Sequence, residues 1–375
     1  MKKIALIGST GSIGRQTLSV VRAHSDKFEI VSLAGGYNER LFLEQVKEFK
    51  PKVATFGKEF SDRQDGVEYF FGENAFTSAI TSEADVVVVA LVGFKGILAV
   101  LDAIEKGKDI ALANKESLVV GGELVMQKAK EKGVRISPID SEHSAIWQAL
   151  NFDFNTPFKK IILTASGGAF RDLSLKELEC VSASDALKHP NWQMGAKITI
   201  DCATLVNKAF EVIEAKWLYN TSIDNIDVII HRQSIIHSMV EFNDNSVIAQ
   251  LSYPSMEVPI ALALTYPDRI TSNIKSLDFA SLSTLNFEKV DKQKYPCFDL
   301  VLDASRQGGD YPALINGANE VAVDLFLKGK IKYTDIYKAL YGSLQAYYGS
   351  HHLDMEHLTE ADQYGREYVK ELFSK

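Results

Sequence analysis

The chain has 375 residues, of which 46% are hydrophobic and 24% are charged, and its formal net charge is -8. This length is sufficient for two or three domains, each with its own core. The acidic balance, without a block of Lys or Arg, argues against binding to nucleic acid or to an anionic membrane. The three cysteines are too few and too widely spaced for a disulfide framework or a Cys-based zinc site. We therefore expect a reducing compartment, most simply the cytoplasm.

The first residues, MKKIALIG, mimic the opening of a secretory signal, but the apolar run ends at Gly8, which is too short for such a segment. The longest apolar run, VVVVALVG at 86–93, is far shorter than a membrane span. We therefore expect neither a signal peptide nor a membrane anchor.

Short apolar runs alternate with amphipathic stretches over the first part of the chain. The runs predict strands at 3–7, 29–33, 53–56, 86–90 and 110–113, and the stretches at 38–49 and 96–108 predict helices. This alternation is typical of a parallel, doubly wound sheet.

The rhythm changes after Asp140. Strand-like runs at 159–168, 226–242 and 246–253 accompany one long predicted helix at 203–219, which indicates a sheet with helices on one side. Residues 265–295 lack sustained periodicity and are predicted to form a linker. From about Pro296 the pattern is helical to the last residue.

Three glycines, Gly8, Gly11 and Gly14, follow the first predicted strand and precede a helix. Gly8 would permit the tight turn, Gly11 would let a pyrophosphate approach the backbone, and Gly14 would let the helix pack on the strand. The free N–H groups of the helix would bind the phosphates. The alternative is a glycine-rich turn without a ligand, but the strand–turn–helix context favours a dinucleotide site.

The end of the second predicted strand indicates which dinucleotide binds. An acid there would favour NAD by binding the ribose hydroxyl, but the segment VSLAGGYNER has no acid at the strand end. Gly36 and Asn38 could approach a 2′-phosphate and Arg40 could pair with it, so NADP is the better prediction.

Asp140 and Glu142 lie where a strand is expected to end, in RISPIDSEH. Alternate residues of an extended chain project to the same side, and two such carboxylates suit a cation that prefers oxygen ligands, such as Mg²⁺ or Mn²⁺. A D-x-E pattern alone is weak, and this stretch favours a solvated loop or a helix cap formed by Asp140 and Ser141.

A third acid changes that balance. In the helix predicted at 203–219, an apolar stripe lies nearly opposite a polar stripe that carries Asn207, Lys208 and Glu211. Glu211 could complete a three-carboxylate metal site, and Asn207 and Lys208 could hold an anionic group of a substrate. The alternative is a solvated face with an ordinary Lys208–Glu211 pair, which contributes little.

Seven segments occur in a characteristic order: GSTGSIG, LANKESLV, DSEHSAIWQ, ASGGAF, HPNWQMG, TLVNKAFEVIEA and INGANEVAV. Together they resemble the 1-deoxy-D-xylulose-5-phosphate reductoisomerase family over nearly the whole chain. The resemblance implies an α/β fold with an N-terminal Rossmann-like parallel sheet (1–139), a central α+β catalytic and dimerisation domain (140–264), a linker (265–295) and a C-terminal helical bundle (296–375). It also implies a homodimer that isomerises and reduces a keto-sugar phosphate with NADPH and Mg²⁺, Mn²⁺ or Co²⁺.

The resemblance also implies roles for individual residues. The metal ligands would be Asp140, Glu142 and Glu211. The substrate and the catalytic chemistry would involve Lys115, Ser141, Ser166, His189, Asn207 and Lys208 together with Glu142 and Glu211. The cofactor would contact Thr10, Gly11, Ser12, Ile13, Gly36, Asn38, Asn114, Glu116 and Gly195. The segment HPNWQMG would be a mobile flap in which Trp192 covers the substrate and excludes water.

Three positions depart from the family pattern. Cys202 stands where the family usually has a serine that donates to the phosphate, and a thiol is a weaker donor. Tyr37 occupies a position often held by a lysine beside the 2′-phosphate, and Arg232 replaces a common proline. Two rival functions remain open: an NADP-dependent dehydrogenase of the semialdehyde or homoserine type, which needs no carboxylate triad, and a nucleotide-binding regulator without turnover.

Overall fold

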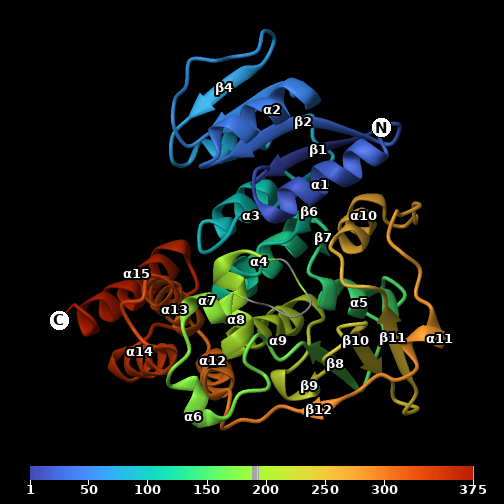
Figure 1. The fold of residues 1–375 in the computed structure, drawn as a ribbon. Coiled ribbons are helices and arrows are strands. Elements are labelled where there is room, and N and C mark those ends of the chain that lie inside the picture. Colours follow the sequence, from blue (N-terminus) through green and yellow to red (C-terminus); the bar gives the residue numbers. More distant parts are fainter. Residues whose placement is uncertain (188–191, 193, 375) are drawn as a thin grey trace. The chain divides into compact units, whose positions relative to one another are not determined.

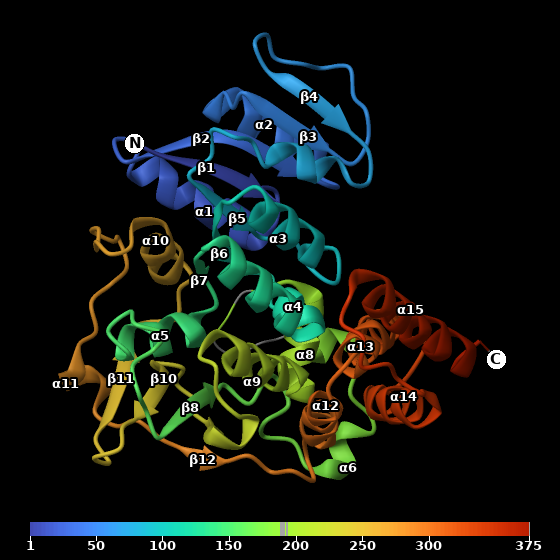
Figure 2. The same cartoon turned by 180° about the vertical axis from the view of Figure 1, so that it is seen from behind.

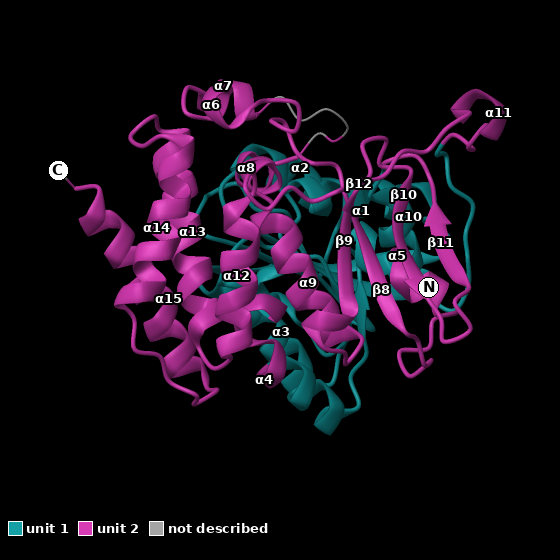
Figure 3. Cartoon of the chain, turned by 90° about the horizontal axis from the view of Figure 1, so that it is seen from below, with its two compact units in different colours: residues 1–117, 125–144, 255–274 teal, residues 118–124, 145–254, 275–375 magenta. Residues whose placement is uncertain are grey.

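The computed structural model describes residues 1–187, 192 and 194–374. The chain folds into two compact units, each assembled from separate stretches of sequence (Figure 3). Unit 1 comprises residues 1–117, 125–144 and 255–274, and unit 2 comprises 118–124, 145–254 and 275–375.

Unit 1 is built on a seven-stranded sheet in the order β4-β3-β2-β1-β5-β6-β7, in which every neighbouring pair is parallel. The predicted parallel sheet is therefore confirmed. β4, at the edge beside β3 (Figure 2), was not predicted, and its side chains are alternately exposed and half-buried. The strands are β1 (Lys2–Ile7), β2 (Phe28–Gly35), β3 (Val53–Phe56), β4 (Glu68–Phe71), β5 (Val86–Val89), β6 (Asp109–Leu112) and β7 (Ile136–Pro138).

Helices lie between the parallel strands in sequence, except between β3 and β4, which a loop joins. They are α1 (Ser12–Ala23), α2 (Glu39–Phe49), the 3-10 helix η1 (Ala75–Ala79), α3 (Gly96–Glu105) and α4 (Glu116–Lys132). In α4 the backbone is non-helical at Gly121, within the short stretch 118–124 that belongs to unit 2.

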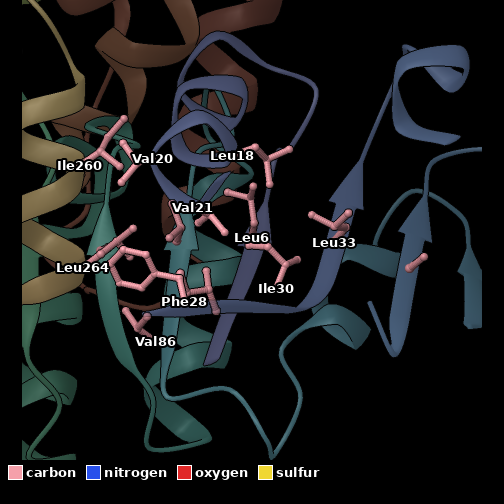
Figure 4. Packing of buried hydrophobic residues seen from close by; sticks show 14 of the residues in the cluster. Leu6, Leu18, Val20, Val21, Phe28, Ile30, Leu33, Val86, Ile260 and Leu264 are labelled. Atoms are coloured by element: carbon pink, nitrogen blue, oxygen red, sulfur yellow. The ribbon is translucent and has the colours of Figure 1, made fainter. Parts of the chain in front are cut away.

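The core of unit 1 joins residues from distant parts of the sequence (Figure 4). Leu18 of α1 and Leu6 of β1 pack together with Ile30 of β2, and all three are at most 4% exposed. Ile260 and Leu264 of α10 (Glu257–Thr265) complete this cluster, with no exposed surface. α10 thus belongs to unit 1, although its sequence falls within the segment 140–264 assigned to the catalytic domain; that division stays a prediction.

Unit 2 contains a five-stranded mixed sheet in the order β11-β10-β8-β9-β12. β8 and β9 are parallel, and the other neighbouring pairs are antiparallel. β12 lies in the segment predicted as a structureless linker, where it pairs with β9 through only two residues. The strands are β8 (Lys160–Ala165), β9 (Ile226–Ile230), β10 (Ile236–Glu241), β11 (Val247–Leu251) and β12 (Glu288–Lys289).

The helix predicted at 203–219 is present from Val206 to Leu218, but its first two residues end a separate preceding helix. α8 (Ala196–Thr204) ends at Leu205, whose φ of 57° places it in the left-handed region, and α9 (Val206–Leu218) begins immediately afterwards. A helical periodicity cannot show this break, because both helices are buried and apolar residues continue across it. The other helices before the C-terminal bundle are α5 (Ser141–Ala149), α6 (Leu175–Leu178), α7 (Ala183–Ala186), η2 (Ile223–Asn225) and α11 (Phe279–Leu282).

The predicted C-terminal helical region is confirmed, and its helices lie together in both views of the ribbon (Figures 1 and 2). Pro296 and Pro312 stand in the first turns of two of these helices, where a missing N–H costs no hydrogen bond. The helices are α12 (Pro296–Gln307), α13 (Tyr311–Leu327), α14 (Tyr333–Ala346) and α15 (Met355–Leu372). No helix in the described residues has the length and apolar character needed to cross a bilayer.

Candidate active site

The glycine turn between β1 and α1 cannot accommodate side chains at two of its positions. Gly8 has a φ of +98°, and a Cβ there would lie 2.5 Å from the carbonyl oxygen of Ala90. A Cβ on Gly14 would lie 2.2 Å from the carbonyl oxygen of Gly8. The roles predicted for Gly8 in the tight turn and for Gly14 in close packing are therefore confirmed by the geometry.

The N-terminus of α1 is suited to an anion. Gly11 is the N-cap and provides no side-chain cap, and the first turn contains no acidic residue. The first N–H groups of a helix and its dipole favour negative charge when no carboxylate competes for them. Gly11 is exposed, and the neighbouring Thr10, Ser12 and Ile13 are half-buried. This turn can therefore receive a pyrophosphate.

The end of β2 is open to solvent. Gly36 and Tyr37 are exposed, and Asn38 caps α2 by accepting a hydrogen bond from the Leu41 N–H at 3.1 Å. The guanidinium of Arg40 pairs with Glu44 at 3.2 Å, and the Arg40 side chain is 90% exposed. Because such an exposed pair is weak, Arg40 can turn towards a phosphate at little cost.

Asn114 has a structural function that the sequence did not reveal. Its side chain is buried, and Nδ2 donates to the carbonyl oxygens of Leu91 and Gly93, both at 3.1 Å. Nδ2 also donates to Glu116 at 2.9 Å, and Oδ1 accepts from the Ser117 N–H at 3.0 Å. These bonds fix the loop that follows β5. The cofactor contacts assigned to Asn114 and Glu116 stay predictions.

The common orientation expected for Asp140 and Glu142 required an extended strand, but the two residues do not lie on one. β7 ends at Pro138, and α5 begins at Ser141, with the Ser144 N–H donating to the Asp140 carbonyl at 2.8 Å. Asp140 therefore stands directly before the helix and Glu142 in its first turn, where the helix dipole favours carboxylates. The helix-start interpretation is correct locally.

The Asp140 carboxylate also has a charged partner outside this helix. It forms an ion pair with Lys115 at 2.8 Å, and the two side chains are only 14% and 10% exposed. The hydroxyl of Ser141 donates to the Glu142 carboxylate. Unit 1 thus holds a carboxylate beside an ammonium in partly dry surroundings, an arrangement that a solvated loop would not produce.

In unit 2, the loop after β8 packs against the end of α8. The Ser166 hydroxyl accepts a hydrogen bond from the Gly168 N–H at 3.2 Å. A Cβ on Gly168 would lie 2.6 Å from the Ala203 Cα, and the φ of Gly168 is +70°. Only glycine permits this approach, which brings the Ser166 loop to the corner between α8 and α9.

The first turns of α9 carry a buried polar cluster. The Asn207 Nδ2 donates to the Glu211 Oε1 at 2.5 Å, and the Lys208 ammonium forms an ion pair with the Glu211 Oε2. The side chains of Lys208 and Glu211 are 4% and 2% exposed. The solvated-face interpretation of this stripe is therefore wrong. Keeping both charges dehydrated is expensive unless they are paired, and such buried groups often serve function.

The remaining predicted residues are His189, Trp192, Gly195 and Cys202. His189 lies outside the described residues, so its substrate and catalytic roles are neither supported nor contradicted. The Trp192 ring lies 6.1 Å from the ring of His237, which is itself bonded to Ser252 at 2.9 Å. Gly195 is exposed and forms the N-cap of α8. Cys202 is half-buried in the last turn of α8.

The donor set fits a hard divalent cation. Asp140 and Glu142 of unit 1 and Glu211 of unit 2 offer only carboxylate oxygens, which suit Mg²⁺ and Mn²⁺. His143 of unit 1 and Glu214 of unit 2 are further side chains of the kinds that ligate divalent cations. His143 and Glu214 were not predicted. His143 follows Glu142 directly and Glu214 stands one turn after Glu211, so helical spacing was the available signal.

Family models match most of the chain. The model described as 1-deoxy-D-xylulose 5-phosphate reductoisomerase matches residues 4–122, and two models of C-terminal domains from the same family match 136–219 and 251–368. A curated relative from Bacillus thuringiensis subsp. konkukian is 44% identical over 100% of this chain and 99% of its own. Another, from Pelotomaculum thermopropionicum, is 47% identical over the full length of both chains. Both carry the name 1-deoxy-D-xylulose 5-phosphate reductoisomerase.

Solved structures agree with the sequence matches. The Zymomonas mobilis reductoisomerase in complex with NADPH is 36% identical, with a TM-score of 0.92 over 100% of this chain and 99% of its own. A reductoisomerase in complex with NADPH, fosmidomycin and magnesium is also 36% identical, with a TM-score of 0.93 over 100% of this chain and 98% of its own. The fold and these matches define an NADPH-dependent oxidoreductase. More narrowly, the chain belongs to the 1-deoxy-D-xylulose 5-phosphate reductoisomerase family.

Proposed function

We propose which residues of this chain bind the metal, the substrate and the cofactor in the reaction of its family. That reaction is the NADPH- and divalent-metal-dependent conversion of 1-deoxy-D-xylulose 5-phosphate to 2-C-methyl-D-erythritol 4-phosphate, in the non-mevalonate route to isoprenoids. The observation that carries the proposal is the dehydrated cluster of Asn207, Lys208 and Glu211, in which a carboxylate, an ammonium and an amide are gathered on two turns of one helix. In such a cluster the carboxylate can ligate a cation, and the amide and the ammonium can bind a phosphate.

Asp140, Glu142 and Glu211 are the proposed metal ligands. Their support is the oxygen-only donor set and the magnesium present in related reductoisomerase structures. A cation held by these residues would act as a Lewis acid on the substrate carbonyl. Lys115, paired with Asp140 at 2.8 Å, places a positive charge beside the substrate backbone, and Ser141 adds a hydroxyl there.

The substrate phosphate is assigned to Ser166, Asn207 and Lys208, with His189 as a further proposed contact. A hydroxyl, an amide N–H and an ammonium are donors that complement a dianion. Because the Lys208 ammonium is nearly dehydrated, its attraction for a phosphate is screened little by solvent. Cys202, in the last turn of α8, replaces a family serine, so we expect this chain to depend more on Ser166 and on backbone N–H groups.

NADPH is assigned to the glycine turn, with its pyrophosphate at the N-terminus of α1. Gly195, Asn114 and Glu116 are further proposed contacts. The exposed Arg40 would meet the 2′-phosphate, in place of the lysine that the family often has where this chain has Tyr37. Residues that hold the aldehyde formed by the rearrangement against the nicotinamide would make the hydride transfer effectively unimolecular. Trp192 would exclude water during this step. C–C cleavage with re-formation and a concerted shift are both compatible with these residues.

The direct test follows the nicotinamide absorbance of NADPH on mixing with 1-deoxy-D-xylulose 5-phosphate and Mn²⁺. Glu211→Gln keeps the shape of the side chain but removes its charge, so activity should fall by about 100-fold or more. Glu179→Gln, at an exposed glutamate, is the matched control and should retain activity. Full activity after complete chelation of divalent cations would instead favour an NADP-dependent dehydrogenase of the semialdehyde or homoserine type. Tight NADPH binding without turnover would favour a nucleotide-binding regulator.

A homodimer is part of the proposal. β11 is an edge strand of the unit 2 sheet, and its Val247 and Ile248 are both 48% exposed. An unpaired edge with apolar side chains is protected economically by a second copy of the same chain. Light scattering should give twice the mass of one chain, and Ile248→Lys should shift that mass towards the monomer. A monomer at micromolar concentration would contradict this part.

A cytoplasmic location also stays a proposal. Its support is that Cys180, Cys202 and Cys297 form no disulfide bond in the part of the chain that the structure describes. A reducing compartment keeps such thiols in this state. Cell fractionation would test it, and recovery of the protein outside the cytoplasm would contradict it.

A further inference from the structure

Helix α13, in the helical region that begins at Pro296, carries two buried asparagines within the segment INGANEVAV. Neither has a role in the proposed reaction. Asn316 and Asn319 have no exposed surface. The Asn319 Nδ2 donates to the Asp201 Oδ1 at 2.8 Å, which connects α13 to α8. The Asn316 Nδ2 donates to the Asp362 Oδ1 at 3.0 Å, which connects α13 to α15. The two asparagines therefore make chemically similar bonds to different parts of unit 2.

Asp201 stands one turn before the corner between α8 and α9. Its side chain is 3% exposed and also accepts from the Lys197 Nζ at 2.9 Å. The Lys197 Nζ lies 5.7 Å from the ring centroid of Phe210 in α9, which connects the Asp201 pair to the second helix of the corner. A dehydrated carboxylate held by an amide and an ammonium is fixed in both position and direction.

A second bond from the bundle reaches the same corner. The hydroxyl of Tyr333, at the start of α14, donates to the Ala203 carbonyl at 2.7 Å. Its ring packs against Phe170 and Phe326, with centroid separations of 5.1 and 6.0 Å. The last turn of α8 is thus held by one bond from α13 and another from α14.

The corner itself needs this support. Leu205 adopts a φ of 57° and a ψ of 13°, a left-handed conformation that a leucine holds only when its surroundings enforce it. Immediately after it, α9 presents Asn207 and Lys208, the proposed phosphate donors. A small rotation of α8 at this point would displace both donors together, and a displacement of about 1 Å is enough to weaken a bound group strongly.

We propose that Asn319 is a positioning residue for the substrate phosphate, which acts through Asp201 and the Leu205 corner on Asn207 and Lys208. The inference rests on the proposed assignment of the phosphate to these two residues. The C-terminal bundle thereby sets substrate affinity without itself contacting the substrate, and the segment INGANEVAV acquires a function in the reaction.

The test compares Asn319→Ala with Asn316→Ala, a matched control on the same helix. Each variant removes one buried amide, which donates to Asp201 in the case of Asn319 and to Asp362 and Glu320 in the case of Asn316, so both should lower the midpoint of thermal unfolding. Only Asn319→Ala should raise KM for 1-deoxy-D-xylulose 5-phosphate, by about tenfold, with the KM for NADPH unchanged. The inhibition constant of inorganic phosphate should rise by a similar factor, because the effect is on the phosphate donors. Equal KM values in the two variants would overturn the inference.

Tyr333→Phe provides an independent check if Asn319→Ala does not fold. It removes the hydroxyl that bonds Ala203 but keeps the ring contacts. The same rise in KM and in the phosphate inhibition constant is expected, and no change in either would overturn the inference. Failure of the proposed function looks different, because the unmodified enzyme would then not turn over the substrate at all, and the positioning role would fall with it.

Discussion

Replacing Lys208 with Met tests the buried cluster of α9 without relying on catalysis. The substitution keeps a long side chain but removes the ammonium that pairs with Glu211, where the two side chains are 4% and 2% exposed. Removing one partner of a buried pair costs about 3–5 kcal/mol, and we expect about 3 kcal/mol because Asn207 still donates to Glu211. The midpoint of thermal unfolding should therefore fall by several degrees.

Mn²⁺ should restore part of the stability that Lys208→Met loses. If Glu211 is a metal ligand, the Lys208 ammonium competes with the cation for the same carboxylate. Removing it should tighten Mn²⁺ binding by about tenfold, which adds about 1.4 kcal/mol of stabilisation at a fixed excess of the metal. Thermal unfolding measured over a series of Mn²⁺ concentrations gives this difference directly. The substrate KM should rise at the same time, with the KM for NADPH unchanged.

Lys216→Met is the matched control. Lys216 belongs to the same helix, but its Nζ lies 4.2 Å from the Trp217 ring centroid, and burial lowers its pKa. This variant should change the unfolding midpoint without changing the shift that Mn²⁺ produces. If Mn²⁺ stabilises Lys208→Met no more than it stabilises the unmodified protein and Lys216→Met, the assignment of Glu211 to the metal is wrong.

Two further predictions concern Trp192 and the stability at low pH. If Trp192 covers the substrate, as we propose, Trp192→Ala should raise the substrate KM by about tenfold, because water would then reach the bound substrate; unchanged KM and kcat would contradict that role. The neutral His231 ring accepts from the Ile235 N–H at 3.2 Å and donates to the Asn286 carbonyl at 2.9 Å, and burial lowers its pKa. Below about pH 6.5 the unfolded chain then binds more protons than the folded chain. The stability that the neutral His231 ring contributes is therefore present above that pH and is lost as pH falls through the folded-state pKa. The unfolding midpoint of His231→Gln should consequently vary less between pH 7 and pH 5, and an equal slope for both proteins would refute this role.

Local patterns predicted most of the sheet of unit 1 correctly. The strands at 53–56 and 86–90, for example, appear as β3 (Val53–Phe56) and β5 (Val86–Val89). Continuous apolar runs between amphipathic helices are read from neighbouring residues alone, so parallel strands covered on both faces are visible without long-range information. The same applies to Gly8 and Gly14, whose spacing after a strand already indicates why no side chain fits.

Patterns failed where distant residues decide the structure. The break at Leu205 was missed because the bonds that support it come from Asn319 and Tyr333, more than 100 residues later. β12 was missed because two residues have no periodicity of their own, and they form a strand only by pairing with β9. The stripe with Lys208 and Glu211 was open to interpretation as a solvated surface, since helical spacing cannot show what lies opposite it.

By itself, the sequence determined the chemistry that is available: glycines that admit a phosphate to a helix N-terminus, acids that suit a hard cation, and the order of motifs that defines the family. The tertiary structure alone decided which of these groups are dehydrated and what holds them. Glu211 and Lys208 are a strong pair rather than a weak one because the packed chain removes water from both. Burial depends on every segment that folds against a helix, and the helix's own residues cannot encode it.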